Sequence, residues 1–208
     1  MRSRRKKTDE KEGVYTGFPV CARKMRNLFV LSGPSGCGKN TVYEALRQKM
    51  PSLAQTVSAT TRPARSGEMD GVDYYFLSTR EFEEKIAEDA FVEYVRYGEN
   101  YYGTLKSEIV RLTEAGNTIL LIIEVRGALR FKKLFPEAVS IFLLPPSEDA
   151  LRRRILKRGQ NTPEEVEARL TIAMQELSLK DQYDYNVIND DLDRCVEEVY
   201  AIITDEKE

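Results

Sequence analysis

The chain has 208 residues, of which 41% are hydrophobic and 32% are charged, and its formal net charge is −2. This length suits one domain with a substantial core, and the balanced charge gives no general reason to expect binding to nucleic acid or to a membrane. The chain contains no histidine, which excludes histidine general bases, histidine metal ligands and Ser-His or Cys-His triads.

The first 26 residues differ in composition from the rest of the chain. They begin with a basic cluster at 2–7 and have no apolar stretch typical of a signal peptide, so we expect a solvated, disordered tail rather than an RNA-binding arm. The apolar runs elsewhere are of strand length, which argues against a transmembrane segment. Cys21, Cys37 and Cys195 are isolated, as is typical of reduced thiols, and we expect a cytoplasmic location.

The apolar run 28–31 predicts a buried strand, and a glycine-rich turn follows it. Its glycines let the backbone curl so that successive N–H groups point at an anion, and the helix predicted over 41–50 adds its positive N-terminal end. Lys39 supplies a mobile cation for the outer phosphates. The strand, the helix and the lysine argue against a plain glycine-rich turn. We therefore predict a nucleotide-phosphate site at Gly33, Pro34, Ser35, Gly36, Cys37, Gly38, Lys39, Asn40 and Thr41.

Strand and helix signals alternate along the rest of the chain, which indicates an α/β fold with a parallel sheet. The almost wholly apolar segments 118–125 and 139–144 predict strands buried on both faces. Ser78 and Glu81 fit a capping box at the start of a helix. Helices are predicted over 78–88, 107–115, 147–158, from 162 onward, and over 191–204.

Several long motifs, in order, resemble those of guanylate kinases: GPSGCGK, VSATTRPARSGEMDGVDYYF, FVEY with NYYGT, PPSEDALRRRILKRG, and VINDD. The similarity covers everything from about Asn27 to the last helix. It implies transfer of a phosphoryl group from ATP to GMP or dGMP, with Mg²⁺, by a monomer or a homodimer. It also implies a P-loop three-layer α/β/α core with a parallel sheet (27–57, 107–146 and 171–208), an inserted GMP-binding lobe (58–106) and a helical lid (147–170), after a tail of 1–26.

On the acceptor side, the resemblance assigns guanine selection to Glu93. A carboxylate accepts both N1–H and N2–H₂ of guanine, a donor pair that adenine lacks, and an unpaired buried carboxylate is costly. Arginine side chains are forked, permanently charged donors that suit a phosphate. The remaining GMP positions that the resemblance carries over are Ser58 and Thr104 at guanine O6, Arg62, Arg65, Tyr74 and Tyr102 at the phosphate, and Glu124.

On the donor side, phosphoryl transfer requires positioning and neutralisation of charge rather than covalent chemistry. The resemblance places Lys39 and three arginines, Arg154, Arg158 and Arg169, near the transferring phosphate, and Asn189 beside the adenine. Arg154 and Arg158 share one helix face, so a hinged lid would bring both in together and exclude water. We expect the other basic residues of that helix, Arg152, Arg153 and Lys157, to face solvent.

Three positions depart from the family pattern. Asn40 replaces the hydroxyl residue after the loop lysine, Ile122 stands where a second acid is usual, and Arg126 follows Glu124 where a neutral or acidic side chain is expected. Mg²⁺ keeps most of its waters, so no protein ligand is assigned, and Asn40 and Glu124 are the candidates, directly or through water. We expect a working enzyme with reduced turnover or altered metal dependence.

Two other functions compete with this interpretation. A non-catalytic guanylate-kinase-like binding module is expected to lose the phosphate loop or the lid arginines, whereas this chain keeps both, and only Asn40 and Ile122 point toward it. A kinase for another nucleoside monophosphate conflicts with Glu93 and with the loop that carries Arg62 and Arg65. A screen of acceptor nucleotides discriminates among the three.

Overall fold

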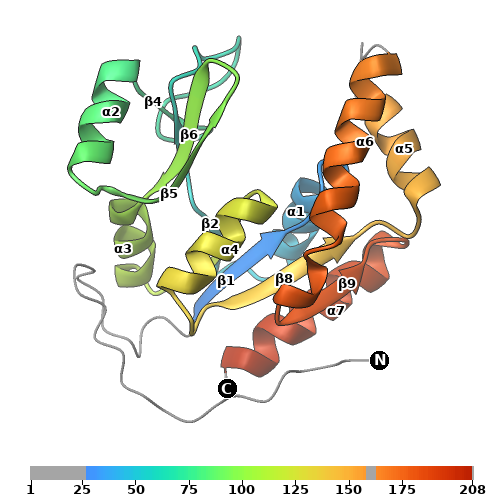
Figure 1. Cartoon of the computed structure of the whole chain (residues 1–208). Helices are drawn as coiled ribbons and strands as arrows, with labels where there is room; N and C mark the ends of the chain where they lie inside the picture. Colours follow the sequence, from blue (N-terminus) through green and yellow to red (C-terminus); the bar gives the residue numbers. More distant parts are fainter. Residues whose placement is uncertain (1–26, 158–162, 208) are drawn as a thin grey trace.

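The larger of two sheets forms the centre of the molecule (Figure 1). The computed structural model describes residues 27–157 and 163–207, so the N-terminal tail, Arg158 and Thr162 lie outside the described residues. The predicted parallel sheet is confirmed, since every neighbouring pair in it runs parallel. Its strands lie in the order β2 (Leu53–Gln55), β7 (Thr118–Ile122), β1 (Leu28–Ser32), β8 (Val139–Leu144) and β9 (Tyr185–Ile188).

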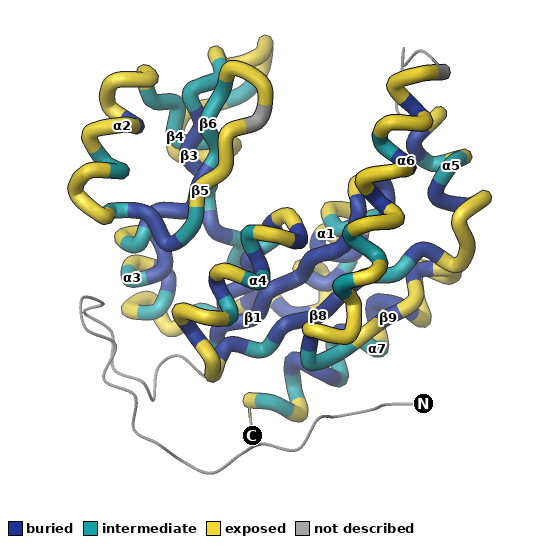
Figure 2. Tube along the Cα trace, viewed as in Figure 1, coloured by how far each residue is buried: buried dark blue, intermediate teal, exposed yellow. Residues whose placement is uncertain are grey.

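Helices cover both faces of this sheet, because alternate residues of each strand point to opposite sides. Phe29 and Leu31 of β1 belong to the cluster that contains residues of α1 (Lys39–Lys49) and α7 (Leu192–Lys207). Leu28 and Val30 belong instead to the cluster with α3 (Lys106–Glu114) and α4 (Val125–Leu134). The buried strands between exposed helix faces form the expected three layers (Figure 2).

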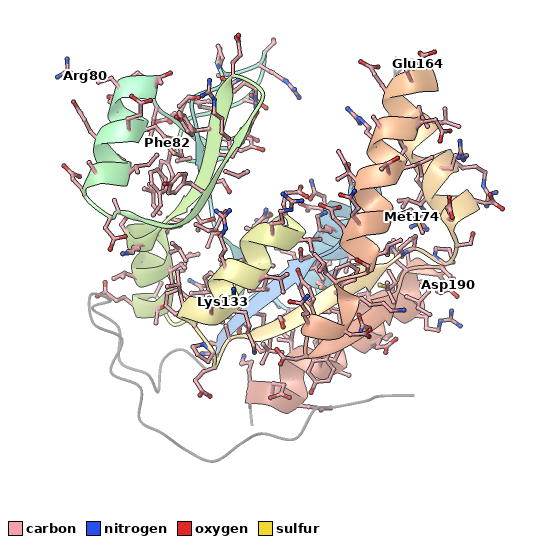
Figure 3. All side chains as sticks on the ribbon, viewed as in Figure 1. Arg80, Phe82, Lys133, Glu164, Met174 and Asp190 are labelled. Carbon is pink, nitrogen blue, oxygen red and sulfur yellow. The ribbon has the colours of Figure 1, made fainter. Side chains whose placement is uncertain are left out.

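A smaller four-stranded sheet is built from the segment between β2 and α3. Its strands lie in the order β4 (Tyr75–Phe76), β3 (Ser58–Thr60), β6 (Asn100–Leu105) and β5 (Phe91–Tyr97). The helix α2 (Thr79–Ala87) directs Phe82 toward this sheet, where its ring stacks on Phe91 with centroids 4.2 Å apart (Figure 3). The predicted capping box of Ser78 and Glu81 is confirmed at the start of α2.

A pair of helices, α5 (Glu148–Lys157) and α6 (Pro163–Leu177), rises from the larger sheet on the side opposite the smaller sheet (Figure 1). Leu151 and Ile155 of α5 pack against Val166, Leu170 and Ala173 of α6 in a separate apolar cluster. A short 3₁₀ turn (Lys180–Gln182) then leads toward β9. Among the described helices, none is long and apolar enough to cross a bilayer.

The strand predicted over 118–125 is wrong at its end. The strand β7 stops at Ile122, and Glu124 takes an extended conformation as the N-cap of α4, which the sequence analysis did not predict. Val125, Ala128 and Phe131 are buried and follow the spacing of a helix. The apolar run before them is continuous, so the sequence does not show where the strand spacing gives way to the helix spacing. Strands β2 and β9 were also not predicted.

Glu108 connects the two sheets through a buried carboxylate. It lies on α3 with its side chain 1% exposed, and it pairs with Arg111 at 2.8 Å. It also accepts a hydrogen bond from Val57 N–H at 3.1 Å and one from the Tyr75 hydroxyl at 3.0 Å. Val57 precedes the smaller sheet and Tyr75 belongs to it, so one carboxylate orients that sheet relative to α3.

We expect Glu108→Ala to lower the free energy of unfolding by about 2–3 kcal/mol, because it leaves a buried N–H group and a hydroxyl without their acceptor. Urea denaturation followed by circular dichroism measures this loss. Glu114→Ala, at an exposed position near the end of the same helix, is the matched control and should change stability by less than about 0.5 kcal/mol. Equal losses in both variants would contradict the role of Glu108.

Candidate active site

The glycine-rich turn between β1 and α1 has the conformation of an anion-binding loop. Gly33, Gly36 and Gly38 have φ angles of +145°, +92° and +100°, which L side chains rarely adopt. A Cβ atom at Gly33 would lie 2.4 Å from the carbonyl oxygen of Leu143, and one at Gly38 would lie 2.4 Å from the amide nitrogen of Asn189. Only glycine fits at these two positions, and the loop is therefore shaped before any anion arrives.

Two side chains from distant segments hold this loop at the carbonyl of Cys37. Asn189 donates its amide hydrogen to that oxygen at 2.8 Å, and Arg154 donates from Nη1 at 3.3 Å. Arg154 also donates from Nη2 to the carbonyl of Asn189 at 2.8 Å. The predicted residues Asn189 and Arg154 are thus brought to the loop. Burial raises the pKa of the Cys37 thiol, which keeps it neutral there.

A polar cleft of about 280 Å³ runs from the phosphate loop to the smaller sheet. It brings together many of the predicted residues from both sides of the molecule. Asn40 and Ile122, two of the departures from the family pattern, also line it. Three lining residues, Gln55, Thr56 and Asp73, were missed, and of these only Asp73 lies within a motif that carried the resemblance. The predicted residues in the lining are Ser35, Gly36, Gly38, Lys39, Asn40, Ser58, Tyr74 and Glu124.

The three residues predicted to read guanine lie side by side on β3, β6 and β5. Ser58 is the register partner of Thr104, which is in turn the partner of Glu93. The Thr104 hydroxyl donates to Glu93 Oε1 at 2.9 Å, and burial raises the pKa of Glu93. A Cβ atom at Gly127 would lie 3.1 Å from Glu93 Oε2, so this glycine lets the first turn of α4 approach the carboxylate.

The residues predicted to bind the acceptor phosphate gather near β4. The rings of Tyr74 and Tyr102 meet edge to face with centroids 6.3 Å apart, and the guanidinium of Arg62 lies 5.4 Å from the Tyr74 centroid. Arg62 also forms an ion pair with Glu68 at 2.8 Å. The sequence analysis missed Glu68, although it follows Gly67 inside the quoted motif. Arg65 is exposed, and its backbone N–H donates to Glu68 at 2.7 Å.

The arginines that were predicted to lie in a lid fall only partly within the described residues. Arg158 lies outside the described residues, and Arg169 is half-buried on α6. Arg153 is exposed, as expected, and it lines an open pocket of about 310 Å³ next to Arg154. The other residues that line this pocket are Pro146, Ala150 and Asp190.

The oxygen atoms that line the cleft suit a hard cation that is bound together with a substrate. Within residues 27–157 and 163–207, no cluster of three or more histidine, cysteine, aspartate or glutamate side chains could hold a metal ion. Asn40 and Glu124 line the cleft with oxygen atoms, and both residues are exposed. One or two such oxygens, with phosphate oxygens and waters, suffice for Mg²⁺. The residues present therefore fit that ion.

Glu176 is a half-buried acid on α6 that the sequence analysis missed. Burial, together with the nearby charge of Glu124, raises the pKa of Glu176 from 4.5 to about 7, while Lys39 and Arg126 oppose the shift. The loop lysine lies close by, and its Nζ donates to the carbonyl oxygens of Gly33 at 2.6 Å and Pro34 at 3.3 Å. Glu176 thus adds a titrating carboxyl near the loop.

Comparisons with known proteins agree with this geometry. The family model described as guanylate kinase matches residues 25–206. The guanylate kinase of Caldanaerobacter subterraneus subsp. tengcongensis is 48% identical over 185 residues, which are 89% of this chain and 90% of that protein. The guanylate kinase of Gloeobacter violaceus is 46% identical over 182 residues, 88% of this chain and 89% of that protein. The crystal structure of guanylate kinase from Anaplasma phagocytophilum superposes with a TM-score of 0.69 at 32% identity, covering 86% of this chain and 85% of that one.

We expect the stability of Glu176→Gln relative to the original chain to depend on pH. Between pH 4.5 and about 7 the carboxyl of Glu176 is ionised in the unfolded chain but protonated in the folded one. The unfolded state then binds fewer protons, so the original chain loses stability as pH rises through this window. The variant lacks this loss, and its advantage in Tm should grow from near zero to about 2–4 °C by pH 7.5, after allowance for solvent screening.

Calorimetry from pH 4.5 to pH 8 measures the two melting temperatures. Glu164→Gln, at an exposed position on the same helix, is the matched control. A Tm difference between Glu176→Gln and the original chain that stays constant with pH would contradict the raised pKa of Glu176.

Proposed function

The chain belongs to the guanylate kinase family, and we propose that it transfers the γ-phosphoryl group of ATP to GMP, with dGMP as a second acceptor, giving ADP and GDP or dGDP. One observation carries this proposal. A single polar cleft is lined by the phosphate loop, by Ser58 of the smaller sheet and by Tyr74, which directly precedes β4. Donor and acceptor phosphates bound at its two ends would meet in line, which is the main requirement of phosphoryl transfer.

On the donor side, the N–H groups of the loop 33–41 and the Lys39 ammonium hold the ATP phosphates. Lys39 is bound to two neutral carbonyl oxygens, at 2.6 and 3.3 Å, which phosphate oxygens can replace. Arg154, Arg158 and Arg169 neutralise charge on the moving phosphoryl group. Arg154 is already at the loop through Cys37, and Asn189 lies beside the adenine as well as supporting the loop.

On the acceptor side, Glu93 selects guanine. The single hydroxyl proton of Thr104, which Glu93 Oε1 accepts in this structure, turns to guanine O6 when the base binds, so that both carboxylate oxygens become available to the N–H donors of the base. Ser58 also donates to O6, and Glu124 closes the site from the N-terminus of α4. The phosphate of GMP is bound by Arg62, Arg65, Tyr74 and Tyr102.

Mg²⁺ enters with ATP in this proposal, with Asn40 and Glu124 as its protein partners, directly or through water. When bound, the ion neutralises charge on the donor phosphates. The chain's own residues supply the rest, since the loop N–H groups and Lys39 fix the donor, and Glu93 fixes the acceptor.

In this proposal the chain consists of a core (27–57, 107–146 and 171–208), a GMP-binding lobe (58–106) and a lid (147–170). We propose a cytoplasmic enzyme that acts as a monomer or a homodimer. The free thiols of Cys37 and Cys195 fit a reducing compartment. A binding module without catalysis is the alternative that Asn40 and Ile122 favour.

We expect Glu93→Gln to lower kcat/KM for GMP by about 100-fold or more, because an amide cannot accept both guanine donors and places an N–H against one of them. The measurement is ADP formation from ATP and Mg²⁺ with GMP, dGMP, AMP, UMP or CMP as the acceptor. Glu99→Gln, at an exposed position between β5 and β6, is the matched control and should behave as the original chain.

The acceptor screen also decides between the functions. GMP-dependent turnover that collapses only in Glu93→Gln supports the proposal. Binding of GMP without turnover in the original chain would establish the binding module instead. Turnover with AMP, UMP or CMP that equals or exceeds turnover with GMP would assign the chain to another acceptor.

Asn40→Ser and Ile122→Asp restore two family side chains that line the cleft. Asn40→Ser replaces a bulky amide oxygen with a small hydroxyl, and Ile122→Asp adds a carboxylate that can order the metal and its waters. We therefore expect either variant to raise kcat and to lower the half-saturating Mg²⁺ concentration, by about tenfold at most. Steady-state rates over a Mg²⁺ titration measure both quantities. No gain in either variant would show that the two departures do not limit this enzyme.

A further inference from the structure

Glu68 and Arg62 form a closely held pair within the loop between β3 and β4. Arg62 Nη1 donates to Glu68 Oε2 at 2.9 Å and Nη2 donates to Oε1 at 2.8 Å, which is the fork-to-fork geometry of a bidentate ion pair. The two side chains are only 15% and 20% exposed. The ion pair lowers the pKa of Glu68 and raises that of Arg62. Both groups therefore stay charged over the working pH range.

Each member of the pair is also fixed by other contacts. The Glu68 carboxylate accepts the backbone N–H of Arg65 at 2.7 Å, and Arg62 Nη1 donates to the Pro63 carbonyl at 2.7 Å. The guanidinium lies 5.4 Å from the ring centroid of Tyr74 and 5.8 Å from that of Phe76. Displacing Glu68 from Arg62 would therefore require several contacts to break together.

The pair leaves part of the guanidinium available. Arginine has five N–H donors, and Glu68 and Pro63 occupy three of them, all on Nη1 and Nη2. The Nε–H and one Nη2 hydrogen remain for the Tyr102 hydroxyl, whose hydrogen bond contributes to the raised pKa of Arg62, and for a bound ligand.

We propose that Glu68 is a positioning residue for the acceptor phosphate: it locks the Arg62 guanidinium against Tyr74 so that the remaining N–H donors point at the phosphate of GMP. This inference rests on the proposed function, which assigns that phosphate to Arg62. Glu68 does not touch the substrate. It acts by removing the cost of ordering a long side chain when GMP binds. A carboxylate that merely occupied the phosphate site would have the opposite effect, since it would compete with GMP.

The test compares the full chain with Glu68→Gln and Glu68→Ala in steady-state kinetics and in calorimetric binding of GMP and guanosine. We expect KM and Kd for GMP to rise about tenfold, which corresponds to about 1.4 kcal/mol. The KM for ATP, kcat and the Kd for guanosine should change less than about twofold, because these quantities do not depend on the acceptor phosphate. Glu68→Gln, which keeps the shape and one hydrogen bond, should lie between the original chain and Glu68→Ala.

The matched control is Glu84→Gln, which breaks an exposed ion pair with Arg80 on α2 of the same lobe. Arg80 points away from the rest of the molecule (Figure 3), so this variant should match the original chain in every constant. Unchanged or tighter GMP binding in the Glu68 variants would overturn the inference. The inference would also be overturned if kcat and Tm fell while the KM values for GMP and ATP both rose, because that pattern would indicate a structural role. A full chain that binds GMP without turnover contradicts only the proposed catalysis, whereas one that binds no GMP overturns both proposals.

Discussion

The carbonyl oxygen of Cys37 is the point on which the shape of the phosphate loop depends. Asn189, at the end of β9, and Arg154, on α5, both donate to it, and the first of these contacts joins residues 152 positions apart. A carbonyl oxygen has two lone pairs, so these donors satisfy it fully. The same amide of Asn189 lies where a side chain at Gly38 would have to go. The loop, the strand β9 and the helix α5 therefore adopt their positions together.

Lys39, Arg154 and Arg62 are restrained in two chemically different ways. Lys39 and Arg154 donate to neutral backbone carbonyls, which a phosphate oxygen can replace with a gain in charge attraction. Arg62 is bound to the carboxylate of Glu68, which is itself anchored, so this contact is not exchanged cheaply. The first two can move with their ligands, whereas the third is preorganised. A chain of nearly balanced charge thus combines mobile cations at the phosphate loop with a fixed cation in the loop between β3 and β4.

Much of this arrangement follows from local sequence. The phosphate loop, the capping box at Ser78 and the two long buried strands were predictable because each depends on neighbouring residues. The helix α4 was not, since the apolar run 118–125 continues through its N-cap and conceals where the strand ends. The electrostatic interactions of Glu176 with Glu124 and Lys39 depend on where α6 packs. No spacing along the chain encodes them. The assignments of Glu93 and the lid arginines came from family resemblance rather than from pattern.

The position of Glu108 has a mechanical consequence. The backbone crosses between the two sheets twice, at Val57 on the way into the smaller sheet and at Leu105–Lys106 on the way out. Glu108 lies one turn beyond the second crossing and binds the N–H of Val57 at the first, at 3.1 Å. This hydrogen bond therefore holds the two crossing segments next to each other. Rotation of the smaller sheet about the line through the two crossings keeps this hydrogen bond, whereas rotation about the other two axes would stretch it.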